Sequence, residues 1–225
     1  MNNQKMLEYM KRIVVFVVVV LYSSLGFAQQ DEKAKEILKK VTETTRGYST
    51  ISASFNYVME NKEEGIHEGY KGNILLKGDQ FYLNLPSLGM EIYNNGETVW
   101  TYMKDANEVT VADSDDEMNE LMDPSKLFTI YEEGFSYQFI EEKNVGGIPV
   151  YVIDLFPEND EIEYSKIRIQ IEKQRMLIKN AEMIGKEGNN YIVQATSLKT
   201  DVPAGDADFV FDQDKSANVE VIDLR

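Results

Sequence analysis

The chain contains no cysteine and a single histidine, His67, among its 225 residues. The absence of cysteine excludes disulfides, thiolate metal sites, thiol catalysis and lipid attachment through cysteine. One histidine argues against a Ser-His-Asp mechanism and against a multi-histidine zinc site. The sequence also lacks a glycine-rich phosphate loop and a G-x-S-x-G elbow. We therefore expect a protein that is not an enzyme and that uses no cofactor and no metal.

Basic residues are few, with 23 Lys+Arg against 39 Asp+Glu and a formal net charge of -16. A partner with a phosphate backbone requires clustered Lys and Arg, so the balance argues against nucleic-acid binding. A surface this negative is repelled by anionic lipid headgroups and attracted to basic protein surfaces.

Residues 1–28 differ from the rest of the chain. Lys5, Lys11 and Arg12 precede an unbroken apolar run over residues 13–21, and the segment ends on Gly26-Phe27-Ala28. This order is typical of a secretory signal, and the apolar run is short for a membrane span. We expect cleavage after Ala28, which leaves residues 29–225 as a single exported domain. The alternative interpretation is an uncleaved membrane anchor.

The spacing of apolar residues changes once near the start of that domain. Ala34, Ile37, Leu38 and Val41 lie at helical spacing, which predicts an amphipathic helix over residues 31–46 that must pack on a sheet. From Ile51 apolar residues alternate with polar ones, which predicts strands. The predicted strands span residues 51–59, 70–76, 81–85, 90–93, 98–103, 108–111, 135–140, 150–155, 167–171, 176–184 and 191–198, and residues 209–211 and 219–224 could add an edge strand.

A helical segment interrupts the strands over residues 114–131, where Ser114 and Glu117 fit a capping box. The strands recur about every ten residues, as in a meander, a sandwich or a barrel. The residues alone thus predict one antiparallel β domain with an N-terminal helix and a helical insertion in its middle.

Two acidic clusters are the remaining candidates for chemistry. The first, Asp113, Asp115, Asp116 and Glu117, lacks the ligand spacing and the glycine of an EF-hand and fits a solvated helix start. The second, Glu158, Asp160, Glu161 and Glu163, is most simply a charged loop. A hydrolase reading would need a bound metal or a close carboxylate pair here. His67 falls in a polar hairpin connection, where a solvated side chain is the simplest interpretation.

Methionine and aromatic residues are plentiful on the predicted strands and on the helical insertion. Methionine is flexible and recurs at adaptable apolar binding sites, so these residues could line a cavity under a curved sheet. The alternative is that they only fill a core.

Several segments in order resemble the LolA-like outer-membrane lipoprotein carrier family. They are Gly72-Asn73-Ile74-Leu75-Leu76-Lys77 with Phe81, then Asn95 to Tyr102 with Val109-Thr110-Val111, and finally Phe209-Val210-Phe211 with residues 219–223. The resemblance implies a mainly antiparallel α+β fold, in which an unclosed β-barrel or strongly curved sheet and a helical lid enclose an apolar cavity. It implies a monomeric periplasmic chaperone that takes acylated lipoproteins from an inner-membrane lipoprotein-releasing transporter to an outer-membrane receptor. A lipoprotein-sensing or regulatory module on the same fold is the alternative.

The resemblance also implies a set of lipid-binding residues. Phe81 matches a family aromatic on the cavity-facing strand, and alternation places Leu83 and Leu85 on the same side. The full set is Ile37, Leu38, Phe55, Tyr57, Phe81, Leu83, Leu85, Met90, Ile92, Val99, Met103, Met118, Leu121, Met122, Leu127 and Phe128. The sequence departs from the family after Lys77, where Gly78-Asp79 stands in place of an Arg-Pro pair whose arginine latches the lid.

Overall fold

The computed structural model describes residues 32–114, 134–159, 162, 164–212 and 218–225. In these ranges a helix over residues 32–47 is followed by twelve strands of one sheet. The first six strands are β1 (Ile51–Asn61), β2 (Ile66–Lys77), β3 (Gln80–Leu85), β4 (Met90–Asn94), β5 (Thr98–Met103) and β6 (Glu108–Asp113). The others are β7 (Phe135–Val145), β8 (Ile148–Pro157), β9 (Tyr164–Glu172), β10 (Leu177–Gly185), β11 (Asn190–Thr200) and β12 (Glu220–Asp223).

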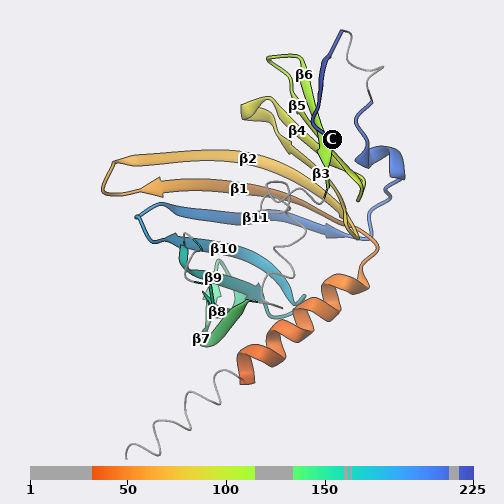
Figure 1. Cartoon of the computed structure of the whole chain (residues 1–225). Coiled ribbons are helices and arrows are strands. Elements are labelled where there is room, and N and C mark those ends of the chain that lie inside the picture. The colour runs from red at the N-terminus through yellow and green to blue at the C-terminus, as the bar shows by residue number, and fades with distance from the viewer. Residues whose placement is uncertain (1–31, 115–133, 160–161, 163, 213–217) are drawn as a thin grey trace, which may run out of the picture.

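The strand order is β12-β6-β5-β4-β3-β2-β1-β11-β10-β9-β8-β7. Two antiparallel meanders, β1 to β6 and β7 to β11, join where β1 pairs with β11. The curved sheet stays unclosed, because β7 and β12 form its two ends and lie apart (Figure 1). The expected antiparallel β architecture is confirmed, with one exception: β12 runs parallel to β6.

The helix packs on one face of the sheet, as its pattern predicted. Its stripe of Ala34, Ile37, Leu38 and Val41 is buried in a cluster with strand residues of β7 to β10. The cross-strand register extends this face through every strand, and we call it the helix-side face. The strand members of the cluster are Phe139, Ile153, Leu155, Ile167, Ile169, Ile171 and Ala181.

A second cluster lies on the helix-side face of β1 to β5. Its buried members are Ile51, Ile74, Leu76, Phe81, Leu83, Ile92 and Val99. Among the described residues, the helix contributes to the first cluster, and Tyr48, just after the helix, packs against the second. The helix therefore covers one half of the sheet and leaves the β1 to β5 half to other contacts.

The C-terminal segment crosses the opposite face of the sheet. A 3-10 helix, η3 (Asp206–Phe209), contacts β3 and β4, and Phe209 and Phe211 are buried. Phe211 packs against the rings of Tyr93 and Tyr102. The prediction of a strand at 209–211 is wrong, whereas the edge strand predicted near the C-terminus is confirmed as β12.

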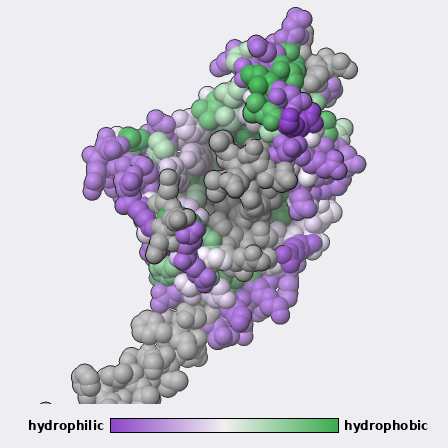
Figure 2. All heavy atoms as spheres, viewed as in Figure 1, coloured by the Kyte–Doolittle hydropathy of each residue, from purple (hydrophilic) through white to green (hydrophobic). Residues whose placement is uncertain are grey.

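Apolar side chains are exposed on this last strand. Val221 is 44% exposed, Ile222 37% and Leu224, just beyond β12, 67%. From the side shown in Figure 2, apolar residues gather over β5, β6 and β12, and most of the other described surface is hydrophilic. No helix in the described ranges is long and apolar enough to cross a membrane.

Candidate functional site

The candidate residues on the strands all share the helix-side face. Cross-strand pairs bring them together from β3, β4 and β5: Leu83 faces Ile92, Leu85 faces Met90, and Met90 faces Met103. The others on this face are Phe55 and Tyr57 on β1, Phe81 on β3 and Val99 on β5. Strand alternation predicted that Phe81, Leu83 and Leu85 lie on one side, because successive residues point to opposite faces. The pairing of neighbouring strands places the other candidates on the same face.

Burial divides the candidates into two groups. Four are core residues of the second cluster: Phe81, Leu83, Ile92 and Val99. The other five, Phe55, Tyr57, Leu85, Met90 and Met103, are only partly buried. The partly buried group is the apolar surface that a ligand could contact, and we call Phe55, Leu85, Met90 and Met103 the apolar patch.

Gly72 allows a close contact within this patch. Gly72 lies opposite Phe55 in the β1–β2 register, and the Phe55 ring lies over it. A Cβ atom at Gly72 would lie 2.8 Å from Phe55 Cε1 and 2.9 Å from Leu85 Cδ2. The missing side chain of a strand glycine is thus replaced by an aromatic ring from the neighbouring strand, which joins β1 to β3 across β2.

The helix candidates are core residues. Ile37 is 6% exposed and Leu38 3%, both inside the first cluster. The predicted helical insertion lies largely outside the described residues, as do its candidates Met118, Leu121, Met122, Leu127 and Phe128.

Two tyrosines near the patch were missed by the sequence reasoning. The ring of Tyr57 stacks on Tyr70 of β2 and on Tyr191 of β11, each with centroids 6.3 Å apart and planes 24° from parallel. Hairpin pairing of β1 with β2 could have suggested Tyr70. Tyr191 is distant in sequence, and only the β1–β11 pairing places it here.

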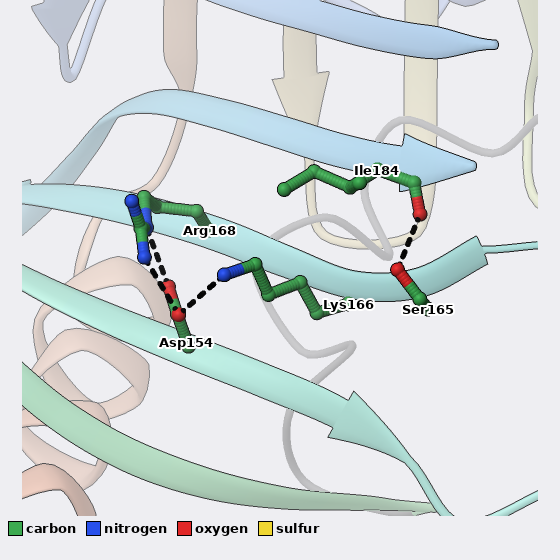
Figure 3. Close-up of polar contacts among 5 residues, drawn as sticks. All are labelled: Asp154, Ser165, Lys166, Arg168 and Ile184. Atoms are coloured by element: carbon green, nitrogen blue, oxygen red, sulfur yellow. Dashed lines mark hydrogen bonds and ion pairs between the residues drawn. The ribbon is translucent and has the colours of Figure 1, made fainter. Parts of the chain in front are cut away.

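A buried carboxylate with two cationic partners lies on the opposite face of the sheet. Asp154 is buried there and accepts hydrogen bonds from Arg168 and Lys166 (Figure 3). Burial favours the neutral acid, but the hydrogen bonds and charges of Arg168 and Lys166 outweigh burial and hold the pKa of Asp154 below its usual value. In the same view the Ser165 hydroxyl donates to the carbonyl of Ile184. Every bond here ties neighbouring strands together, which is a structural role.

A second polar network on that face surrounds Glu91. Its carboxylate accepts from the hydroxyls of Tyr82 and Tyr93, at 3.1 and 2.9 Å, and pairs with Lys104 at 2.7 Å. Burial opposes ionisation, yet the bonds from Lys104 and the tyrosines lower the pKa of Glu91. Burial and the nearby Glu91 charge raise the pKa of Tyr82 to about 12. These hydroxyls hold their protons at neutral pH and act as donors to a fixed carboxylate.

The acidic clusters and His67 offer no assembled site in the described residues. There, no three His, Cys, Asp or Glu side chains are grouped so that they could hold a metal ion. Asp113 ends β6 and Glu158 follows β8, and the other cluster members lie outside the described residues. The prediction that His67 lies in a loop is wrong, because β2 begins at Ile66; its side chain is nevertheless 72% exposed.

Gly78-Asp79, the departure after Lys77, forms the tight turn between β2 and β3, and Gly78 has a positive φ of 58°. Glycine adopts this left-handed conformation without strain. Lys77 itself pairs with Asp206 of η3 at 2.7 Å, and its ammonium lies 6.0 Å from the Phe209 ring centre. Lys77 therefore ties β2 to the C-terminal segment.

One family model matches more than half of the chain. Residues 24–153 match the family described as outer membrane lipoprotein carrier protein LolA. The chain belongs to the LolA family. This LolA-like family consists of binding or carrier proteins rather than enzymes. No curated protein sequence matches the chain.

Solved structures match this chain at low sequence identity. An uncharacterised conserved protein from Thermus thermophilus is 10% identical, with a TM-score of 0.59 over 85% of this chain and 99% of that one. A LolA superfamily protein from Nitrosomonas europaea is 13% identical, with a TM-score of 0.44 over 80% and 98%. A putative outer membrane lipoprotein-sorting protein domain from Vibrio parahaemolyticus is 13% identical, with a TM-score of 0.45 over 77% and 94%.

Proposed function

We propose that this LolA-family protein is an exported carrier that binds the acyl chains of lipoproteins on the helix-side face of β1 to β5. The observation that carries the proposal is the apolar patch of Phe55, Leu85, Met90 and Met103, which remains partly exposed beside a buried apolar cluster. Covering apolar surface with an acyl chain is favourable by about 0.8 kcal/mol per buried methylene.

The family match supports a route for the cargo. We propose that the protein works in the periplasm after cleavage at Ala28, as a monomer, between an inner-membrane lipoprotein-releasing transporter and an outer-membrane receptor. The acidic balance, with a net charge of -16, supports basic docking surfaces on those partners.

A test of cargo binding needs variants that do not unfold the protein. Phe81 is only 3% exposed, so a charge there would test folding instead of binding. Met90 is partly exposed on the helix-side face, and Val58 is partly exposed on the opposite face of β1. The test compares cargo binding by Met90→Glu with binding by Val58→Glu, the matched control.

The readouts are the affinity for a fluorescent palmitoylated peptide and native mass spectrometry of the protein isolated from its own periplasm. Met90→Glu is expected to weaken peptide binding by at least about tenfold, because the acyl chain would have to desolvate a carboxylate. Val58→Glu should bind like the parent protein, and both should remain folded. Absence of bound acyl groups in the parent protein, or equal losses in both variants, would refute the assignment.

A further inference from the structure

Three stacked tyrosines form a ladder across the centre of the sheet. Tyr70, Tyr57 and Tyr191 come from the adjacent strands β2, β1 and β11, which lie side by side in Figure 1. Tyr57 and Tyr70 are a direct cross-strand pair, and Tyr191 faces Met59, two residues from Tyr57. All three side chains are partly exposed on the helix-side face.

The ladder continues the apolar patch toward water. On β1, Ile51 is buried, and Phe55 and Tyr57 are partly exposed. On β2 the same face passes from the buried Ile74 through Tyr70 to the exposed Glu68. Tyr70 and Glu68 thus add polar groups to this face near the β1–β2 hairpin, beside Met59 and Ile66, which matches an amphiphile whose tail lies on the patch and whose polar end lies on the ladder.

Glu68 supplies the charge of this surface. The register places just one charged residue, Glu68, on the helix-side face of β1 to β5 and β11. Its carboxylate accepts a hydrogen bond from the Tyr70 hydroxyl at 2.8 Å. The pKa of Tyr57 is raised, most by burial and then by the neighbouring Tyr191, Tyr70 and Glu68. The ladder and Glu68 therefore share one local environment.

The three tyrosine rings and the Glu68 carboxylate favour a positively charged group as their ligand. Aromatic faces attract Lys and Arg through their quadrupole, and an adjacent carboxylate adds a direct Coulomb attraction. We propose that the tyrosine ladder and Glu68 bind the peptide part of an acylated cargo and prefer a Lys or Arg close to the acylated residue. This proposal rests on the carrier function and adds a preference among cargoes to it.

The test uses palmitoylated peptides that differ only at the two positions after the acylated residue, with Lys-Lys, Ser-Ser or Glu-Glu there. The Lys-Lys peptide is expected to bind about fivefold more tightly than Ser-Ser, and Glu-Glu more weakly than both. The Lys-Lys preference should shrink as salt is raised from low to physiological ionic strength, because both partners are partly exposed.

Variants separate the local site from the overall charge. Glu68→Gln should remove most of the preference, whereas Glu64→Gln, an exposed carboxylate in the same hairpin, changes the net charge equally and should preserve it. Tyr70→Leu should reduce the preference, and Tyr70→Phe, which keeps the ring, should retain it.

Equal binding of the three peptides, or equal effects of Glu68→Gln and Glu64→Gln, would overturn the ladder proposal and leave the carrier function standing. If none of the peptides binds the parent protein, both proposals fall together.

Discussion

The buried carboxylate of Asp154 gives the sharpest prediction about stability. The Asp154 side chain is 3% exposed, and its partners Lys166 and Arg168 are 25% and 33% exposed. Arg168 holds both carboxylate oxygens, at 2.6 and 2.8 Å, and Lys166 adds a contact at 2.9 Å. Asp154→Asn keeps the size of the side chain and removes the charge that all three bonds share.

The expected loss follows from that geometry. Breaking one side of a fully buried ion pair costs about 3–5 kcal/mol. Arg168 and Lys166 retain access to water, so we expect a smaller loss, about 2–3 kcal/mol at neutral pH. For a chain of this size each kcal/mol lowers the melting temperature by about 2–4 °C, which predicts a fall of about 4–12 °C.

The effect should depend on pH in one direction. Because the folded pKa of Asp154 lies below that of an unfolded aspartate, about 3.9, its stabilisation is fully present above that value. The stabilisation is lost as the pH falls through the folded pKa, so the two proteins should converge in acid. Thermal melts from pH 7 down to pH 3 measure this.

An exposed ion-pair network serves as the control. Glu142 bridges Lys33 and Lys173 at 3.0 and 2.6 Å, but its side chain is 42% exposed. Glu142→Gln should lower the melting temperature less than Asp154→Asn does, since solvent screens exposed pairs. The reasoning would be refuted if Asp154→Asn left the melting temperature unchanged at pH 7, or if its loss of stability stayed constant down to pH 3.

Two further substitutions probe the packing of each face by thermal melts. Gly72→Ala should lower the free energy of unfolding by about 1–3 kcal/mol, because the new methyl group would displace Phe55. Gly69→Ala on the same strand has no contact nearer than 3.9 Å and should change stability little. Equal effects of the two substitutions would contradict the Phe55–Gly72 contact. Phe209→Ala should lower the free energy of unfolding by about 3–5 kcal/mol, because the ring is fully buried. Val210 is 37% exposed, so Val210→Ala should lower it far less. A small loss of stability in Phe209→Ala would show that η3 does not hold the C-terminal segment.

Alternation predicted the strands well because one face of almost every strand packs against apolar residues. The start of β2 was missed since Ile66, His67 and Glu68 follow a short turn and are mostly exposed, so they carry no apolar alternation. At residues 209–211 the pattern predicted a strand that does not form. Phe209 and Phe211 alternate like strand residues, yet they bury their rings on the opposite face without joining the sheet.

The order of the strands in the sheet could not be predicted from the sequence pattern. Hairpins such as β3–β4 follow from short connections, but the β1–β11 and β12–β6 pairs join distant segments and depend on the whole sheet. The same limit applies to the candidate site. Alternation placed Phe81, Leu83 and Leu85 on one face, but only the packing of neighbouring strands decides that Phe81 and Leu83 are core and Leu85 is partly exposed.

Partial burial of the patch also bears on release, which a carrier needs as much as binding. Complete burial of one acyl chain of about 15 methylenes would contribute up to about 12 kcal/mol, and several chains would approach the limit of non-covalent affinity. Leu85 and Met90 are already partly covered by the second cluster, so a bound chain removes only their remaining exposed surface from water. Methionine side chains also repack at low cost when a ligand leaves. Under the proposed carrier function, a half-covered patch would therefore hold a lipid more weakly than an empty, fully apolar cavity, and transfer to the proposed receptor would need only a modest difference in affinity.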